Sequence, residues 1–541
     1  MKKNSHSYRK EVILFTDGYK LDHRRQYPEG TEMVYANMTP RSCNWYPEAE
    51  DGAVVFGLQY LIKEYLTKRF NEDFFNRPKD EVVNEFARRV NTFLGKNGVG
   101  TKHIEELHDL GYLPIRIKAL PEGSLCPMRV PMLTIQNTHP DFFWLTNYLE
   151  TLISTELWLP CTSATTARLF KKELMRHAEK TGTKGIITGF NIHDFSMRGM
   201  GGVESAVMSG MGHMTSFCGS ETLPAIAAVE EYYNADAEKE LIAGTVPATE
   251  HSVMEAGGKE TEYDTYKRLL TQVYPEGFVS IVSDTWDFWK VMTETIPSLK
   301  DVIMQRDGRF VVRPDSGEPI DIICGIEPDF IYNYNGKKYY DSAARWSGSS
   351  SLYSDYERAM HYHIHDGTID NYEVSDAEIK GAYELLLDTF GYTVNEKGYK
   401  VLDTHVGLIY GDSITLWKQK EIYRILENKG IAATNIVLGV GSYSYQLKSR
   451  DSLGFAVKTT AVRINGELIE VFKSPKTDRG IKKSLKGLLR VDKDENGKFY
   501  VTDRVSEEDE KGGELVTVFE DGKLVREISL EEIRTNVDNT L

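Results

Sequence analysis

The chain has 541 residues, more than one ordinary hydrophobic core can organise, so two or three domains are expected. Its 40% apolar and 27% charged residues are typical of a globular enzyme. The formal net charge of −16 excludes nucleic acid and anionic membrane as favourable partners, because both repel an acidic surface. An anionic substrate would therefore need a local basic pocket.

The N-terminus and the cysteines predict a cytoplasmic protein. Only four consecutive apolar residues follow the basic start, too few for a signal-peptide core, and no apolar run approaches the roughly 20 residues of a membrane helix. The five cysteines are scattered and form no CxxC pair, which indicates reduced thiols and no zinc site. They are Cys43, Cys126, Cys161, Cys218 and Cys324.

The first 180 residues mix short strands with helical segments, and residues 141–181 carry apolar side chains at helical spacing. Between about 185 and 442, short β-branched runs end at Gly or Asp, and a helical pattern often follows. This alternation predicts a parallel sheet or an α/β barrel. In such a barrel the active site lies just past the strand ends.

Other segments lack this alternation of strand and helix patterns. Residues 330–375 are rich in Tyr, Ser and Gly and predict a long irregular insert. After residue 486, two runs with Asn-Gly and Asp-Gly turns predict hairpins, and LEEIRTNV predicts a short closing helix. We therefore expect an α/β barrel catalytic domain over 181–444, and a mixed α+β domain built from residues 1–180 and 445–541.

Three loops at successive strand ends carry residues suited to a phosphorylated sugar. RPDSG presents Arg313, for an amide or a phosphate, and Asp315, for sugar hydroxyls or Mg²⁺. YGDS places Gly411 and Asp412 before a helix whose free amides can bind phosphate, and GVGS allows a close backbone approach at Gly441. Alone, RPDSG is equally compatible with a turn, the Asp of YGDS is well explained as a helix cap, and GVGS is better explained as a simple turn; three such loops together favour a phosphate site.

Two further motifs carry candidate site residues, and the first of them follows an apolar strand. HDFSMRG offers Phe195 as a stacking surface for a flat base and Arg198 as a phosphate ligand, with a core phenylalanine as the alternative for Phe195. VPATEHS contains Glu250 and His251, and Asp284 lies at the next strand end. A carboxylate can raise the basicity of His251 or orient its ring, with a structural histidine as the alternative.

A basic stretch follows the barrel between residues 448 and 493. In a chain with a charge of −16 it predicts either a clamp for polyphosphate or a solvated strand face. Its members are Arg450, Lys458, Arg463, Lys473, Lys476, Arg479, Lys482, Lys483, Lys486 and Arg490. In the insert, His361, His363 and His365 would share one face of a strand and could bind a metal, away from the other motifs.

Taken together, these motifs resemble the nicotinamide phosphoribosyltransferase family over nearly the whole chain. The resemblance starts at TDGYKLDHRRQYP (16–28) and ends at EIRTN; between them, in one order, lie HDFSMRG, VPATEHS, SIVSDTWD, VRPDSGEP, YGD, GVGS and VFKSPKTDRGIKKSLKG. It implies an enzyme that joins nicotinamide to phosphoribosyl pyrophosphate and releases pyrophosphate and nicotinamide mononucleotide in NAD salvage. It also implies a homodimer with active sites at the subunit interface, Mg²⁺ as cofactor, and ATP hydrolysis coupled through a phosphohistidine.

The resemblance assigns roles to individual residues. Phe195 matches the aromatic under the pyridine ring, Tyr19 the one that covers it from the partner subunit, and Arg313 the contact to the carboxamide. The carboxylates near the ribose are Asp315 and Asp412, and those implied for the metal are Asp315 and Asp284. The phosphorylated histidine is His251, flanked by Glu250 and Asp284.

The phosphates would be held by two sets of residues. The 5′-phosphate seat comprises Arg198, Gly411, Gly441 and Ser442. The basic groups around the phosphates, largely from the partner subunit, are Arg41, Arg450, Lys458, Lys473 and Lys482.

Departures from the family pattern concern both ends of the substrate. Glu221 stands where the family's amide-reading residue is Asp; the longer carboxylate can still accept from an amide, but the fit changes. Ser442 and Ala456 stand where the family has smaller or hydroxyl-bearing residues near the phosphate region. The alternatives are a nicotinate phosphoribosyltransferase, which a carboxylate at Glu221 disfavours, and a non-catalytic nucleotide-binding protein, which the basic clamp and the paired carboxylates disfavour.

Overall fold

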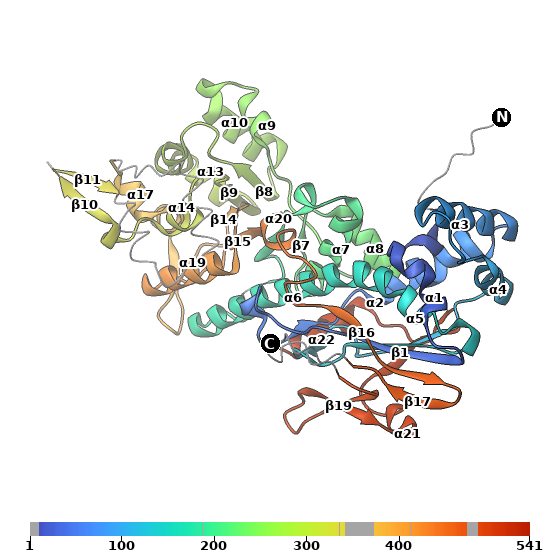
Figure 1. Ribbon diagram of the computed structural model, residues 1–541. Helices are drawn as coiled ribbons and strands as arrows, with labels where there is room; N and C mark the ends of the chain where they lie inside the picture. The colour runs from blue at the N-terminus through green and yellow to red at the C-terminus, as the bar shows by residue number, and fades with distance from the viewer. Residues whose placement is uncertain (1–9, 187, 335, 341–372, 412, 473–484) are drawn as a thin grey trace, which may run out of the picture.

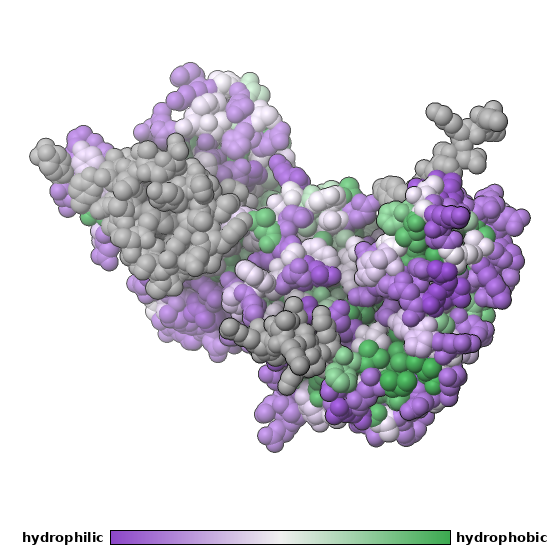
Figure 2. Space-filling model, viewed as in Figure 1, coloured by the Kyte–Doolittle hydropathy of each residue, from purple (hydrophilic) through white to green (hydrophobic). Residues whose placement is uncertain are grey.

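The computed structural model describes residues 10–541 except for 187, 335, 341–372, 412 and 473–484 (Figure 1). The blue N-terminal and red C-terminal segments lie together, and the green to orange middle of the chain forms a second body beside them. Figure 2 shows a mainly hydrophilic surface in the same view, with an apolar patch near the strands labelled β1 and β17. No helix in the described residues is both long and apolar enough to span a membrane.

A parallel sheet forms the core of the middle of the chain, with strands in the order β7-β6-β15-β14-β9-β8. Their bounds are β6 Ile192–Asp194, β7 Gly219–Ser220, β8 Gly277–Val282, β9 Gly308–Arg313, β14 Val406–Tyr410 and β15 Ile436–Val440. Val, Ile and Leu side chains are buried in β8, β9, β14 and β15, as expected where both faces of a sheet are covered.

An irregular segment, residues 244–249, joins the two edges of this sheet. Gly244 forms a parallel bridge with Gly219 of β7, and Ala248 forms one with Ser280 of β8. The amide of Ser280 donates to the carbonyl of Pro247 at 2.8 Å. The sheet is thereby closed, which confirms the expected α/β barrel. The loops after the carboxyl ends of these strands and of this barrel-closing segment form one rim, the barrel mouth.

Helices cover the outside of the barrel. They are α7 Val203–Met214, α8 Leu223–Tyr233, α9 His251–Glu255, α10 Glu262–Arg268, α11 Phe288–Lys290, α12 Ile296–Ser298, α13 Lys300–Gln305, α14 Pro319–Cys324, α17 Asp376–Lys380, α18 Ala382–Phe390, α19 Leu416–Asn428 and α20 Ser442–Tyr445. The helix expected after YGDS is α19. Thr415 caps it by accepting from the amide of Lys418 at 3.2 Å, and the chain turns away at Gly430, whose φ is +69°.

Strands from both ends of the chain share a second, antiparallel sheet in the order β17-β16-β1-β5-β3-β20-β21. The bounds are β1 Thr31–Thr39, β3 Ile115–Ala119, β5 Leu133–Asn137, β16 Ala456–Ile464, β17 Glu467–Glu470, β20 Val516–Glu520 and β21 Lys523–Leu524. This sharing confirms a mixed α+β part built from both chain ends. The expected tail hairpins are β20–β21 and β18–β19, Leu488–Lys493 with Phe499–Val505.

Smaller pairs complete the strands. They are β2 Ala53–Val54 with β4 Leu125–Cys126, β10 Ile331–Tyr334 with β11 Lys337–Tyr340, and β12 Tyr392–Val394 with β13 Lys400–Leu402. The hairpin β10–β11 is the described part of the insert. The helices of the α+β part are α1 His23–Gln26, α2 Leu58–Tyr60, α3 Lys79–Phe93, α4 Lys102–Leu110, α5 Leu145–Tyr148, α6 Glu150–Thr181, α21 Glu507–Glu510 and α22 Leu530–Asp538.

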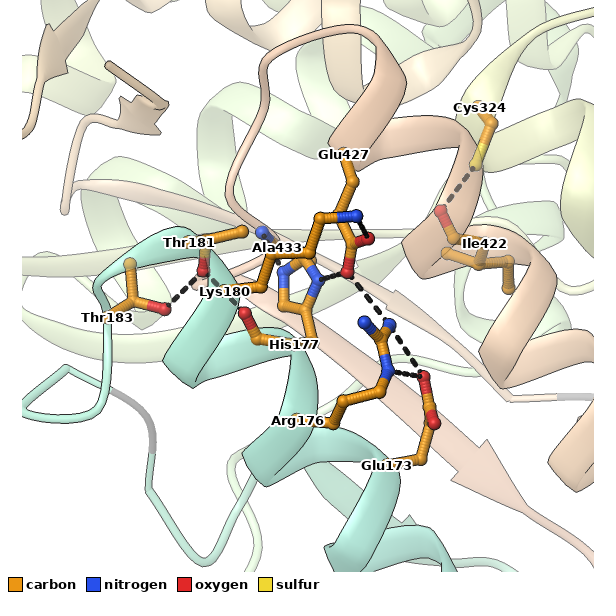
Figure 3. A network of polar contacts seen from close by, with 10 residues as sticks. All are labelled: Glu173, Arg176, His177, Lys180, Thr181, Thr183, Cys324, Ile422, Glu427 and Ala433. Carbon is orange, nitrogen blue, oxygen red and sulfur yellow. Dashed lines mark hydrogen bonds and ion pairs between the residues drawn. The ribbon is translucent and has the colours of Figure 1, made fainter. Parts of the chain in front are cut away.

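Helix α6 connects the two parts of the molecule. Its 32 residues span about 48 Å, and Figure 1 shows it between the antiparallel sheet and the barrel. Three residues near the C-terminal end of α6 bind the buried carboxylate of Glu427 in α19: Arg176 and His177 donate to it at 2.8 Å and Lys180 at 2.6 Å (Figure 3). The amide of Ala433 donates to His177 Nε2 at 3.1 Å, so the ring is neutral and carries its proton on Nδ1.

Burial and hydrogen bonding together determine the charges in this network. Burial lowers the pKa of His177 and favours the neutral ring, although Glu427 opposes this. Burial alone would raise the pKa of Glu427, but its hydrogen bonds from Lys180, Arg176 and His177 outweigh that cost and lower the pKa. The ionised Glu427 therefore fixes α6 to the barrel.

Candidate active site

The loops of the barrel mouth converge on the ring of Phe195, which follows β6. The amide of Phe195 donates to the carbonyl of Val440, at the end of β15, at 3.0 Å. A Cβ atom at Gly439 would lie 2.6 Å from Phe195 Cδ2 and 2.7 Å from Gly411 Cα, so glycine is required beside the ring. A Cβ atom at Gly411 would lie 3.4 Å from Asp315 Oδ1. Phe195, Gly411 and Asp315 are thus brought together from three loops.

A fixed carboxylate lies on the β7 side of this ring. The rings of His193 and Phe195 are 4.7 Å apart, and His193 Nε2 is 3.2 Å from Glu221 Oε1. The hydroxyl of Thr245, in the barrel-closing segment, donates to the same oxygen. The hydrogen bond from His193 is the main cause that lowers the pKa of Glu221; Thr245 and the charge of Arg313 add to it. The mouth therefore offers a flat aromatic surface close to an ionised hydrogen-bond acceptor.

Asp284 holds the histidine loop and the RPDSG loop together. Its Oδ1 lies 3.2 Å from His251 Nε2, and its Oδ2 accepts from the amide of Asp315 at 3.0 Å and from the hydroxyl of Ser316 at 2.6 Å. Burial alone would raise the pKa of Asp284, but these three hydrogen bonds outweigh it and lower the pKa. Glu250, the N-cap residue of α9, is exposed beside this group.

Arg313, at the end of β9, directs its guanidinium towards the barrel-closing segment. Its Nη1 donates to the carbonyl of Thr249 at 3.2 Å, and its Nη2 lies 3.7 Å from Asp315 Oδ2. A largely buried cation next to the carboxylates suits the carbonyl oxygen of an amide or a phosphate oxygen. In the parts of the chain that the structure describes, no three His, Cys, Asp or Glu side chains form a cluster that could hold a metal ion.

On the other side of Phe195, the loops after β6 and β15 pack directly on each other. A Cβ atom at Gly199 would collide with the hydroxyl of Ser442, the first residue of α20. Gly441 is the N-cap residue of α20, and Arg198 is exposed. Backbone amides at a helix start and an exposed guanidinium occur together here, an arrangement that binds anions.

A second group of expected residues lies on the antiparallel sheet. Arg41 follows β1 and donates to the carbonyl of Gly454 at 2.9 Å, and Lys458 pairs with Asn37 of β1. Burial is the main cause that lowers the pKa of Lys458; the neighbouring charges of Arg41, Lys20 and Arg450 add to it, and Glu150 opposes it. We call Lys20, Arg41, Arg450 and Lys458 the basic patch.

Tyr19 belongs to the same region as the basic patch. Tyr19 is 63% exposed, and Lys20 Nζ lies 5.5 Å from the centroid of its ring. Lys20 is itself buried and bonded to Glu150 at 2.6 Å and to the carbonyl of Asn147 at 2.9 Å. Tyr19 is therefore presented to solvent on a firmly held segment.

Some expected residues lie outside the described residues. They are Asp412, Lys473, Lys476, Arg479, Lys482, Lys483, His361, His363 and His365.

His193, Thr245 and Ser316 are site residues that the sequence patterns did not single out. For His193 a signal was present, since residues two apart in a strand face the same side and Phe195 was already a candidate. Thr245 lies in a Pro-containing segment without a strand pattern, and Ser316 reads as an ordinary turn residue.

Comparisons with known proteins agree with this geometry. The nicotinate phosphoribosyltransferase (NAPRTase) family matches residues 190–523, and the nicotinamide phosphoribosyltransferase N-terminal domain matches residues 11–117. The chain is 46% identical to a nicotinamide phosphoribosyltransferase of Acinetobacter baylyi, over 99% of this chain and 98% of the relative. It is 31% identical to a nicotinamide phosphoribosyltransferase of Xanthomonas campestris pv. campestris, over 98% of this chain and 99% of the relative.

Among solved structures, a nicotinate-nucleotide pyrophosphorylase from Pyrococcus furiosus has the same fold, with a TM-score of 0.53 at 15% identity, covering 100% of this chain and 98% of that one. The barrel fold and the geometry of the loops at its mouth agree with the family of the full-length relatives. The chain is therefore a member of the nicotinate phosphoribosyltransferase (NAPRTase) family, and it carries the N-terminal domain of nicotinamide phosphoribosyltransferases.

Proposed function

We propose that the chain transfers the phosphoribosyl group of phosphoribosyl pyrophosphate to nicotinamide, and so forms nicotinamide mononucleotide and pyrophosphate in NAD salvage. The observation that carries this proposal is the carboxylate of Glu221, ionised and fixed by His193 and Thr245 beside Phe195. Such a group accepts a hydrogen bond from the amide of nicotinamide and repels the carboxylate of nicotinate. The names of the Acinetobacter and Xanthomonas relatives support the same base.

The chemistry follows from the charges that develop. The pyridine nitrogen forms a bond to C1 of the ribose while the bond from C1 to pyrophosphate breaks, and its electron pair leaves with pyrophosphate. Phe195 would stack on the ring and Arg313 would bind the amide oxygen, which holds the nitrogen in line for attack. Asp315 would stabilise the positive charge that builds on the sugar. No proton leaves the pyridine nitrogen, so the step requires no general base.

We propose Mg²⁺ as the cofactor, with Asp315 as its protein ligand in the described residues. Mg²⁺ commonly binds through one or two carboxylates, water and substrate phosphates, so a cluster of three protein ligands is not needed. Both oxygens of Asp284 already accept hydrogen bonds from the protein, which suits a role in orienting the loop of Asp315. When bound, the ion would neutralise charge on the leaving pyrophosphate.

ATP is the proposed third substrate, with His251 as the residue that becomes phosphorylated. His251 Nε2 faces Asp284, so Nδ1 would accept the phosphoryl group from ATP while ADP leaves. The carboxylate of Asp284 would stabilise the cationic ring that forms during the transfer.

A homodimer with shared active sites would bring the basic patch into use. Tyr19 and Lys20 precede β1, Arg41 follows it, and Arg450 and Lys458 lie just before and within β16, whereas Phe195 lies in the barrel mouth. We propose that Tyr19 and the basic patch complete the mouth of the partner subunit, where Tyr19 covers the base. Ile469 of β17 and Phe472, just after this strand, are 39% and 49% exposed and add apolar surface for such a contact.

We also propose a cytoplasmic location. None of the five cysteines, all of which the structure describes, forms a disulfide, and three of them are buried, as expected for a protein of a reducing compartment.

Pyrophosphate release tests the proposed reaction. The enzyme is assayed with phosphoribosyl pyrophosphate and Mg²⁺, with nicotinamide or nicotinate, and with or without ATP. We expect kcat/KM for nicotinamide to exceed that for nicotinate by about 100-fold, because facing like charges cost several kcal/mol. We expect ATP to raise the rate of pyrophosphate release, and we expect Asp315→Asn to abolish the release. Release with nicotinate alone would assign the other base, and no release with either would refute the proposal.

A further inference from the structure

The C-terminal helix α22 contacts the barrel through apolar side chains and through one arginine. Leu530, Ile533 and Val537 share a buried cluster with Met211, Met214 and Ile242 of the barrel part. Arg534 Nε donates to the carbonyl of Met214 at 2.9 Å, its Nη1 to that of Leu241 at 2.9 Å, and its Nη2 to that of Ile242 at 2.6 Å. Met214 is the last residue of α7, and Leu241 and Ile242 lead directly into the barrel-closing segment. A planar guanidinium with five donors is the side chain that can hold three carbonyl groups in one arrangement.

The segment that Arg534 holds continues into the base side of the barrel mouth. Ile242 is buried, and two residues later Gly244 donates to Cys218 at 2.8 Å and accepts from Ser220 at 3.2 Å, beside β7. The next residue, Thr245, donates to Glu221. The segment between the end of α8 and the start of α9 has no helix or strand of its own, so its position depends on these side-chain and bridge contacts.

Further contacts fix the position of α22 itself. Ser529 and Glu532 form a capping box at its start, and Leu530 and Ile533 are fully buried. Asn536 donates to the carbonyl of Glu122 at 2.9 Å, on the α+β part. The helix is therefore a fixed support from which Arg534 reaches the barrel.

We propose that Arg534 is a positioning residue for the base: it sets the barrel-closing segment and through it the hydrogen bond from Thr245 to Glu221. This inference rests on the proposed function, since Glu221 is the group that receives the amide. It assigns the end of the chain, 289 residues after Thr245 and outside the barrel, a role in base recognition.

Two substitutions on the same helix separate positioning from general stability. Arg534→Met keeps an unbranched side chain and removes every donor to the barrel. Asn536→Ala removes the hydrogen bond to the α+β part and leaves the barrel contacts unchanged. We expect Arg534→Met to raise KM for nicotinamide about tenfold, because small misplacements of binding groups are costly, and to change KM for phosphoribosyl pyrophosphate less than about twofold. Asn536→Ala should leave both KM values near those of the parent.

A double-mutant cycle with Thr245→Val tests the route from Arg534 to the site. If Arg534 acts through Thr245, the two changes together should raise KM for nicotinamide little more than Thr245→Val alone. Hydrogen exchange of the amides of residues 242–249, measured without substrate, should become faster in Arg534→Met and stay unchanged in Asn536→Ala. Arg534→Lys, which retains a charge and part of the donors, should restore KM partly, and it serves as the test variant if Arg534→Met does not fold.

The failures of the two proposals are distinguishable. An inactive parent enzyme refutes the proposed function, whatever the variants do. The positioning role is overturned if the parent is active and the Arg534 variants raise both KM values equally or combine additively with Thr245→Val. It is also overturned if the amides of residues 242–249 exchange hydrogen at the parental rate in these variants.

Discussion

Replacing Gly439 by alanine tests whether Phe195 is the stacking surface of the site. Gly439 lies in β15, and its φ is outside the left-handed region, so the substitution brings no backbone strain. The new methyl group would lie 2.6 Å from Phe195 Cδ2 and 2.7 Å from Gly411 Cα. Carbon atoms pack at about 3.5–4.0 Å, so the ring must move by about 1 Å.

The magnitude follows from this displacement. Extra methyl groups in a packed site cost about 1–3 kcal/mol, so the variant should unfold at a lower temperature. A misplacement of about 1 Å can reduce catalysis about 100-fold, and we expect kcat/KM for nicotinamide to fall between about 10-fold and 100-fold.

Gly185→Ala is the control, at a glycine that precedes β6 and has no assigned role in the site. A Cβ atom at Gly185 meets nothing within 4 Å, and its φ is outside the left-handed region. Steady-state rates with nicotinamide and thermal melting are measured for both variants. A Gly439→Ala enzyme with parental kcat/KM, or a Gly185→Ala enzyme that is equally impaired, would refute the assigned packing of Phe195.

Glu221→Gln removes the charge that faces the base, so the preference for nicotinamide over nicotinate should fall about tenfold in kcat/KM; an unchanged ratio would show that the carboxylate does not read the base. Asp284→Asn should abolish the stimulation by ATP, because an amide cannot stabilise the charged ring of His251; rates with and without ATP decide, and undiminished stimulation would contradict the role. Glu427→Gln should cost about 2 kcal/mol in urea unfolding at pH 7, because buried donors lose their charged acceptor. The pKa of Glu427 is lowered in the fold, so this difference should be complete above the ordinary carboxyl pKa of about 4 and shrink as the pH falls below it; a difference independent of pH would contradict the ionised state.

The barrel and its mouth were predictable because they depend on local patterns. Apolar β-branched runs ending in HD, SD, RPD, YGD and GVG mark the strands β6, β8, β9, β14 and β15. Parallel strands place their carboxyl ends on one rim, so Phe195, Asp284 and Asp315 meet there without long-range information. Helix α19 was equally readable from its apolar spacing and Gly430.

The rest depends on contacts between distant segments. The barrel-closing segment contains Pro247 and carries no strand pattern, so only its bridges to Gly219 and Ser280 reveal it. The hydrogen bonds of Arg534 to Met214 join residues 320 positions apart, and nothing in a local pattern predicts them. The resemblance to a known family, rather than residue spacing, associated Tyr19 with the base.

A single competition experiment tests the central claim most directly. Nicotinamide and nicotinate are mixed at equal concentration with phosphoribosyl pyrophosphate, Mg²⁺, ATP and the enzyme. The mononucleotide products formed during the first few per cent of turnover are separated and quantified by mass spectrometry. We predict that nicotinamide mononucleotide accounts for nearly all of the product. Nicotinate mononucleotide as the main product, or no mononucleotide at all, would contradict the account.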